Sequence, residues 1–296
     1  MREVGVILTS GFFDGVHLGH RHLLDTVVSL ARERGGEAIA VTFWPHPRTV
    51  LRQDARELRL LSTLEEKKAL ILESGIRRVE VLPFTTDFAR LTASAYLEFL
   101  RDKYGADCVV MGYDNRIGSD LATASGLKGA VPGLEVVQAG ELPVEVFPGG
   151  RISSTVIRKA LERGEVEQAA AMLGYHYRLD GVVVAGNRMG RTLGFPTANM
   201  RLYEPLKMLP GNGVYAVRVK VEGAYYSGMC NIGVRPTVEG HTRTVETHIL
   251  DFDREIYGLP IGLEFLYRVR DERRFPTLEE LRLQLEADKA FIQARG

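Results

Sequence analysis

The sequence is poor in cysteine, has no excess of charge of either sign and contains no long apolar run. Its 296 residues include two cysteines, Cys108 and Cys230, too few for a disulfide framework or a cysteine zinc cluster. Basic and acidic residues number 38 each, which indicates neither a nucleic-acid partner nor a membrane partner. No apolar run approaches the roughly 20 residues that span a bilayer. Residues 1–11 lack the features of a signal peptide. These absences predict a cytoplasmic protein.

The first half of the chain alternates short apolar runs with segments of helical period. Residues 4–10 and 37–43 are predicted strands, and the helix between them ends at two glycines. Its expected apolar face consists of Leu23, Leu24, Val27, Val28 and Ala31. This alternation predicts an α/β domain with a Rossmann-like parallel sheet and helices on both faces. Ligands of such sheets lie at the carboxyl ends of the strands.

From residue 177 onward the chain is mostly strand-like, with glycine and proline turns and an expected hairpin at residues 221–225. A final helix is predicted after Thr277 and Glu280, which stand at capping-box spacing. Its apolar face is expected to hold Leu278, Leu281, Leu285 and Phe291. The pattern predicts a small antiparallel β-barrel with a C-terminal helix. We therefore expect two domains, residues 1–176 and 177–296.

The stretch "GFFDGVHLGHRHLL", residues 11–24, places His17 and His20 just before an amphipathic helix. A strand–loop–helix junction presents free N–H groups and the positive end of the helix dipole. Imidazole N–H groups there would stabilise charge on a phosphate. The glycines that would let the backbone approach such an anion are Gly11, Gly15 and Gly19. An anion site, a structural turn and a metal site are the three interpretations, and no clear third and fourth metal ligands are present.

A second polar segment, "RISSTVIRKAL", spans residues 151–161. It begins a predicted helix with Ser153, Ser154 and Thr155 and places Arg158 one turn later. One interpretation is helix capping, which serine and threonine favour. The other is a phosphate clamp of hydroxyl, N–H and guanidinium groups.

Together, "FDGVHLGH" and "ISSTVIR" resemble the HxGH nucleotidyltransferase superfamily, and within it the prokaryotic FAD synthetases. "VTFWPHP" and "GYDNRIG" resemble further segments of that branch. The resemblance implies in-line attack by the FMN phosphate on the α-phosphorus of ATP, with release of pyrophosphate. It also implies that His17 and His20 polarise the ATP phosphates and that Asp114 lies near the nucleotide or flavin. The implied nucleotide-binding residues are Gly11, Asp14, Gly15, Gly19, Ser153, Ser154, Thr155 and Arg158.

The chain departs from the FAD synthetase pattern at several positions, among them the segment "SDLATASGL", which lacks the expected basic, glycine-ended pattern. Phe12 stands where the family usually has asparagine, and Asn115 and Ile117 stand where it usually has aromatic residues. His46, between two prolines, is either a substrate contact or a turn residue.

The second half carries "GNRMGRTLGFPTANM", residues 186–200. Its three glycines, Gly186, Gly190 and Gly194, form either a turn between strands or a loop that wraps phosphates. The segment is not a Walker A sequence. Thr197 and Asn199 offer a hydroxyl and an amide oxygen, which suit Mg²⁺ held jointly with nucleotide phosphates.

The segment "TVETHILDF" alternates as a strand does, with Glu246 and His248 on one face. A strand carboxylate is either solvated or paired, or serves as a catalytic base. With "GRTLGFPTAN", "NIGVRPT" and "LPGNGVYAVRV", the segment resembles riboflavin kinase. The resemblance implies a six-stranded barrel that binds ATP–Mg²⁺ and riboflavin, with Glu246 either orienting the ribityl 5′-hydroxyl or also acting as its base. Asn231 and Arg235 are further binding candidates, although Arg235 is equally suited to a local ion pair.

The two resemblances follow one another in the order of the bifunctional riboflavin kinase/FAD synthetases. They imply that the chain converts riboflavin to FMN and FMN to FAD, with FMN and FAD as substrate and product rather than prosthetic groups. The expected partners are riboflavin, FMN and ATP with Mg²⁺, and neither nucleic acid nor a membrane. One alternative is an active kinase whose first half has altered or lost acceptor specificity. A second is a non-catalytic flavin- or nucleotide-binding regulator.

Overall fold

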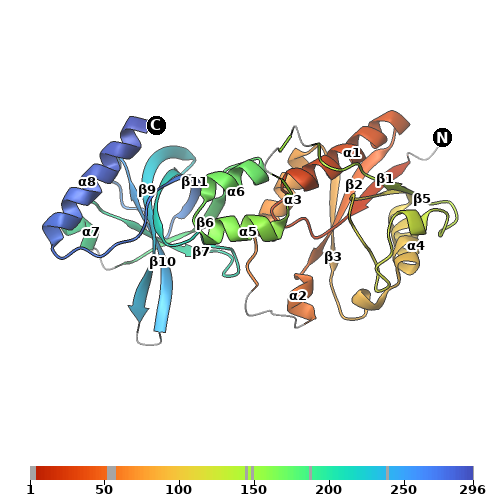
Figure 1. Ribbon diagram of the computed structural model, residues 1–296, viewed down its shortest axis with the longest axis horizontal. Coiled ribbons are helices and arrows are strands. Elements are labelled where there is room, and N and C mark those ends of the chain that lie inside the picture. The colour runs from red at the N-terminus through yellow and green to blue at the C-terminus, as the bar shows by residue number, and fades with distance from the viewer. Residues whose placement is uncertain are drawn as a thin grey trace. The chain divides into compact units, whose positions relative to one another are not determined.

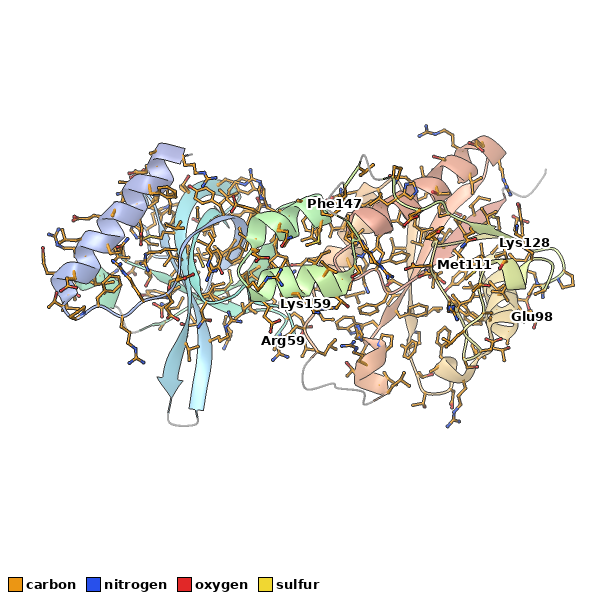
Figure 2. All side chains as sticks on the ribbon, in the orientation of Figure 1. Arg59, Glu98, Met111, Lys128, Phe147 and Lys159 are labelled. Atoms are coloured by element: carbon orange, nitrogen blue, oxygen red, sulfur yellow. The ribbon has the colours of Figure 1, made fainter. Side chains whose placement is uncertain are left out.

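The computed structural model describes residues 5–51, 58–143, 146–147, 150–186, 189–237 and 240–295, apart from the side chains of residues 189, 235–237 and 240–242. The chain forms two compact units, Met1–Ser154 and Thr155–Gly296 (Figure 1). Side chains fill both units (Figure 2). No helix in the described ranges is long and apolar enough to cross a membrane.

The first unit is built on a five-stranded parallel sheet with the order β3-β2-β1-β4-β5. This arrangement confirms the predicted α/β class. The elements of the unit are β1 (Val6–Ser10), α1 (Leu18–Arg34), β2 (Glu37–Trp44), α2 (Pro47–Val50), α3 (Leu64–Glu73), β3 (Arg78–Pro83), η2 (Phe88–Arg90), α4 (Ala93–Tyr104), β4 (Ala106–Met111), η3 (Ser125–Leu127) and β5 (Glu135–Gln138).

Helices cover both faces of this sheet. Neighbouring residues of a strand point to opposite faces and therefore pack against different helices. Ile7 packs with the apolar side chains of α1 and α3, whereas Leu8 packs with those of α4. Of the predicted apolar face of α1, the residues Leu23, Leu24, Val27 and Ala31 are buried, and Val28 is partly buried against the same cluster. The first loop of the chain therefore leaves a central strand, β1, at the carboxyl edge of the sheet.

The second unit is a closed antiparallel barrel with the strand order β10-β7-β6-β11-β8-β9. The predicted hairpin joins β8 to β9 through Glu222 and Gly223, which both adopt left-handed backbone angles. The elements of the unit are α5 (Ser154–Glu162), α6 (Val166–Leu173), β6 (Arg178–Val184), α7 (Met189–Thr192), β7 (Ala198–Leu202), β8 (Gly213–Val221), β9 (Ala224–Thr237), β10 (Gly240–Ile249), β11 (Pro260–Arg270) and α8 (Leu278–Arg295). The predicted barrel is confirmed.

The contacting face of α8 includes the predicted residues and extends beyond them. Leu285 packs on the barrel core, and the Phe291 ring contacts the Tyr267 ring edge-on, although Leu278 and Phe291 are 59% and 47% exposed. The buried residues are Ile292 and Asp288, and the Asp288 carboxylate accepts hydrogen bonds from Arg270 of β11 at 2.8 and 3.1 Å. An ion pair thus takes part in docking the helix, which an apolar pattern does not indicate.

Candidate active sites

The loop between β1 and α1 has an unusual backbone. Phe13, Gly15 and Val16 have φ angles of 52°, 78° and 37°, in the left-handed region. Two of these residues carry side chains that rarely adopt this conformation, and such strain is typical of functional loops. Of the three predicted glycines in this motif, Gly15 is the one that uses its conformational freedom.

His17 and His20 lie together at the start of α1. His17 caps the helix, because its Nδ1 accepts a hydrogen bond from the His20 backbone N–H at 3.3 Å. Its Nε2 then carries the proton. The two rings are stacked, with centroids 3.7 Å apart and an interplanar angle of 14°. The histidines therefore combine a capping role with a shared position at the positive end of the helix.

Burial decides the charge of His20. Desolvation, followed by the nearby charges of His17 and Lys67, holds the pKa of His20 well below its usual value. A neutral imidazole keeps one N–H donor without repelling a second cation. No group of three or more His, Cys, Asp or Glu residues suited to a metal ion occurs among the residues that the structure describes.

Asp14 holds the loop in place from inside. Its buried carboxylate accepts hydrogen bonds from the backbone N–H groups of Leu61 and Ser62 at 3.0 and 3.1 Å. The Ser62 hydroxyl accepts from the Gly15 N–H at 2.9 Å. The Asp14 carbonyl accepts from the Ser154 hydroxyl at 3.0 Å. Ser62, a contact that sequence reasoning missed, follows a short apolar stretch that gives no sign of this partnership.

The other predicted residues of the first site lie in several places. Ser153 directly precedes α5, while Thr155 and Arg158 belong to that helix and to the second unit. Their convergence on the two histidines stays a prediction. Asp114 is exposed and forms an ion pair with Arg151 at 2.6 Å. Gly11 lies beside the Phe13 ring and Gly19 beside the His17 ring. A Cβ atom added at these glycines would come within 3.1 and 3.3 Å of the respective rings.

The structure also shows the contacts of Phe12 and Ile117, two of the departures from the family pattern, and of His46. The Phe12 ring contacts the His46 ring edge-on, with centroids 4.1 Å apart. His46 caps α2 by accepting from the Arg48 N–H at 3.0 Å, which agrees with its turn interpretation. Ile117 packs against the sheet core and pairs with Ala122.

The second site is a row of polar side chains across three strands of the barrel. Glu246 of β10 is the register partner of Asn199 in β7 and of Asn231 in β9. Side chains directly opposite one another on neighbouring strands share a face. Three residues that are far apart in the sequence therefore place a carboxylate between two amides.

Glu246 and Asn231 line a cavity of 590 Å³ in the second unit. Its wall also includes Thr197, His248 and the arginines of residues 270–274. Its apolar lining is formed by Leu193, Phe195, Val214, Met229, Phe275, Pro276, Leu278, Leu281 and Leu285. The mixed lining suits a large ligand that has both an apolar part and hydroxyl groups.

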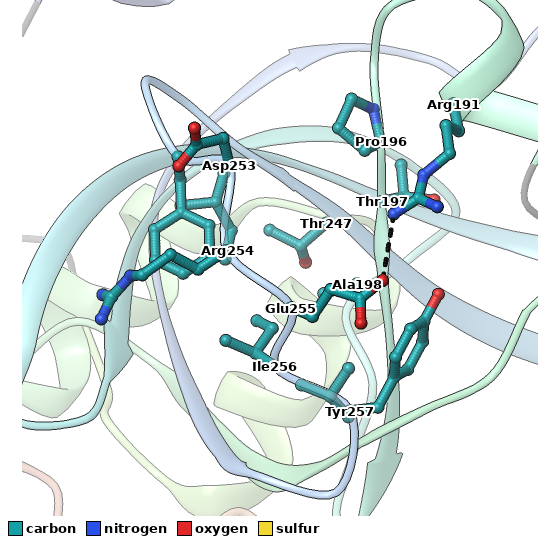
Figure 3. A pocket seen from close by; sticks show the side chains of 13 residues that line it. Arg191, Pro196, Thr197, Ala198, Thr247, Asp253, Arg254, Glu255, Ile256 and Tyr257 are labelled. Carbon is teal, nitrogen blue, oxygen red and sulfur yellow. Dashed lines mark ion pairs between the residues drawn. The ribbon is translucent and has the colours of Figure 1, made fainter.

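A smaller cavity of 260 Å³ adjoins β7 and β10 (Figure 3). Thr247 and Ile249 line it, whereas Glu246 and His248 line the larger cavity, as strand alternation requires. An ion pair between Arg191 and Glu255, 3.5 Å apart, joins two segments of its wall. Thr197 lines both cavities. A group transferred between ligands in the two cavities would therefore pass close to Thr197.

The glycines of residues 186–200 allow close packing around this threonine. A Cβ atom on Gly186 would lie 2.2 Å from Nδ2 of Asn199, and one on Gly190 would lie 2.2 Å from the Phe195 carbonyl. Gly194 has a φ angle of 82°, which makes it the turn residue of the three. The loop is thus held against the residues predicted to bind a metal.

His248 is a buried residue to which the sequence assigned no role. Its Nδ1 lies 2.8 Å from the Pro196 carbonyl, just before Thr197. Burial lowers the pKa of His248, so a neutral ring donates this hydrogen bond. The sequence could have indicated that His248 belongs to the site, because His248 shares a strand face with Glu246. Arg235 lies in β9, but its side chain falls outside the described residues.

Known protein families match both units. The FAD synthetase family model matches residues 2–156, and the riboflavin kinase family model matches residues 173–295. A bifunctional riboflavin kinase/FMN adenylyltransferase of Bacillus subtilis is 36% identical over 96% of this chain and 90% of its own length. The Escherichia coli K12 protein of the same description is 35% identical over 97% of this chain and 91% of its own length.

A solved structure also matches the whole chain. It is the crystal structure of a protein described as a macrolide-efflux protein from Streptococcus pneumoniae, with 32% identity and a TM-score of 0.90. The match covers 99% of this chain and 95% of that one. The fold of both units therefore recurs in a solved relative.

Proposed function

Because the chain belongs to the bifunctional riboflavin kinase/FMN adenylyltransferase family, we propose roles for its residues in two successive reactions. The family phosphorylates riboflavin to FMN and adenylylates FMN to FAD, with ATP as the donor. We assign the kinase to residues 177–296 and the adenylyltransferase to residues 1–176. The transport role named for the Streptococcus pneumoniae relative does not enter this proposal, because the two enzyme families together match most of the chain.

The position of Thr197 between two cavities carries the kinase proposal. ATP occupies the 260 Å³ cavity and riboflavin the 590 Å³ cavity, so that the γ-phosphate and the ribityl hydroxyl approach each other beside Thr197. Glu246 orients the 5′-hydroxyl and accepts its proton as the oxygen attacks the γ-phosphorus. Asn231 binds the ribityl chain beside Glu246, and Arg235 serves as a further contact.

The residues near Thr197 fit a magnesium ion. Thr197 and Asn199 offer neutral oxygen ligands, a donor set that suits Mg²⁺ shared with phosphate oxygens. When bound, the ion would neutralise charge on the transferred phosphoryl group. The backbone at Gly186, Gly190 and Gly194 holds the phosphates of the same nucleotide.

The adenylyltransferase half works by positioning and charge stabilisation. His17 and His20 hold N–H donors at the start of α1, where the helix dipole also favours phosphate. They stabilise the charge that develops as the FMN phosphate attacks the α-phosphorus and pyrophosphate leaves. Asp114 contacts the nucleotide or flavin. The remaining proposed ATP contacts are Gly11, Asp14, Gly15, Gly19, Ser153, Ser154, Thr155 and Arg158.

A flavin assay tests both halves at once. Purified protein is incubated with riboflavin, ATP and Mg²⁺, and the flavins are separated by chromatography. FMN should appear first and FAD second, and omission of Mg²⁺ should stop both steps. Absence of FMN would refute the kinase roles, and absence of FAD from supplied FMN would favour an altered acceptor for the first half. Since ATP is the substrate of both reactions, we also propose the cytoplasm as the site of action.

A further inference from the structure

Lys67 in α3 is a buried cation that the roles proposed above do not use. Its side chain is 1% exposed, whereas the adjacent Lys68 forms a surface ion pair with Glu65 at 3.2 Å. Removing an ammonium group from water is costly unless hydrogen bonds and opposite charge compensate for it. A methionine of similar length would avoid that cost. The retained charge therefore calls for a reason beyond packing.

The hydrogen bonds of Lys67 join the ends of two strands. Its Nζ donates to the Phe12 carbonyl at 2.9 Å and to the Phe43 carbonyl at 3.4 Å. Phe43 is near the end of β2, and Phe12 is two residues beyond the end of β1. The two strands are parallel neighbours, so these carbonyls lie at the carboxyl edge where ligands of such sheets bind.

The same ammonium group contacts the Phe12 ring. Nζ lies 3.9 Å from the ring centroid, within the range of a cation–π interaction. Both the backbone and the side chain of Phe12 are thus held by Lys67. The loop that begins at Phe12 leads directly to His17 and His20. A small displacement of Phe12 would therefore move the two histidines relative to the substrate.

The charge of Lys67 also acts on this loop. Burial lowers the pKa of Lys67 to about 8, opposed by the negative charge of Asp14. Lys67 in turn contributes to the lowered pKa of His20. At neutral pH the site then combines a charged lysine with a neutral histidine. A fixed positive charge behind neutral donors favours a polyphosphate without any reorganisation during the reaction.

We propose that Lys67 is a positioning residue of the adenylyltransferase site, where its ammonium group fixes the backbone that carries His17 and His20 and supplies positive charge behind them. This inference rests on the roles proposed above for the two histidines. Lys67 acts through Phe12 and His20 and does not itself touch the substrate.

The first test compares Lys67→Met with Lys68→Met in the full chain. We expect the Lys67 variant to lose roughly 10- to 100-fold in kcat/KM for ATP during FAD formation from FMN, since misplacement by about 1 Å costs this much. The Lys68 variant should match the wild type. Riboflavin phosphorylation should stay within about twofold in both, because the kinase half is an internal control for protein quality. Fluorescence of Trp44, the single tryptophan, reports unfolding of the first unit.

The second test is the pH profile of the same kcat/KM. The groups that interact with Lys67 are Asp14 and His20; His17 stacks on His20, and His46 lies beyond the Phe12 ring. Activity of the wild type should therefore fall as pH rises through about 8, where Lys67 loses its proton. The Lys67→Met variant should lack this basic limb, which a purely structural role would leave unchanged.

The outcomes separate the two proposals. If the wild type forms no FAD from FMN, the proposed function of the first half fails. If it forms FAD and Lys67→Met is as active as Lys68→Met, only the Lys67 proposal is overturned. If Trp44 shows that Lys67→Met is unfolded, the wild-type profile decides: a basic limb near pH 8 supports the role, and a flat profile from pH 7 to about 9.5 overturns it.

Discussion

The two halves of this protein handle ATP with different architectures. The first site is made of a short loop with left-handed backbone angles at Phe13, Gly15 and Val16, fixed by buried polar side chains. The second is laid out on regular strands, where register alone puts Glu246 between two asparagines. The loop site needs many contacts to hold its shape, while the strand site inherits its shape from the barrel.

The difference corresponds to the chemistry of each half. Transfer of a nucleotide to a phosphate that is already charged requires no base, and in our proposal His17 and His20 supply hydrogen-bond donors that position the phosphates. Transfer of a phosphoryl group to a hydroxyl requires removal of a proton, and Glu246 is the carboxylate that we propose for that task. Substitutions in one half should therefore leave the reaction of the other half unchanged.

The largest effect is expected for Glu246→Gln. Loss of the base should lower riboflavin phosphorylation by roughly 10²–10⁴-fold. FAD formation from supplied FMN should be unaffected. Glu264→Gln is the matched control, because this strand carboxylate pairs with Arg218 and lines neither cavity. If the kinase rates of the two variants agreed within twofold, Glu246 would not be the catalytic base.

His20→Asn should have the next largest effect, in the opposite half. Loss of one preorganised donor should reduce FAD formation by roughly 10²–10³-fold, while the kinase rate is retained. His22→Asn, one position beyond Arg21 in the same helix, should leave both rates near those of the wild type. Parallel loss of both activities in His20→Asn would mean that the two halves are not independent.

Thr197→Val tests the meeting point of the two cavities. Losing a hydroxyl that binds a charged group costs about 1.5–3 kcal/mol, or on the order of 10- to 100-fold in rate. The kinase rate should fall by this amount, and raising Mg²⁺ should recover part of it. Thr244→Val, on β10 but in neither cavity wall, is the control. A Thr197 variant with unchanged kinase rate and Mg²⁺ dependence would contradict the assignment.

The smallest effect is a change in stability with pH. The pKa of His20 is lower in the folded state than in the unfolded state, so the unfolded chain binds the extra proton. The first unit should lose stability as pH falls below about 6.5, with a slope approaching about 1.4 kcal/mol per pH unit for one proton. Urea unfolding followed by Trp44 fluorescence measures it, and His20→Asn should flatten the slope. Equal slopes in both proteins would show that folding does not lower the pKa of His20.

Local patterns were enough to predict the elements of both units. Alternating apolar runs and helical periods identified the parallel sheet, and turn residues marked the hairpin at Glu222 and Gly223. His17 and Thr197 were candidates from residue type and spacing, whereas the role predicted for Glu246 came from the resemblance to riboflavin kinase. The predicted face of α8 was incomplete, because the buried Asp288 makes an ion pair with Arg270 and a hydrophobicity pattern does not reveal paired charges.

The type and spacing of residues 11–24 allowed an anion site, a structural turn or a metal site, and the resemblance of the two halves of the chain to known families indicated the reactions. Only the tertiary structure decided which side chains support those sites. Lys67 and Lys68 are neighbours of one type, yet one is buried against Phe12 and the other is paired at the surface. The row of Asn199, Glu246 and Asn231 exists only after strand pairing brings distant segments together. Burial and register depend on long-range contacts, and these are set by the packed chain rather than by any local stretch of it.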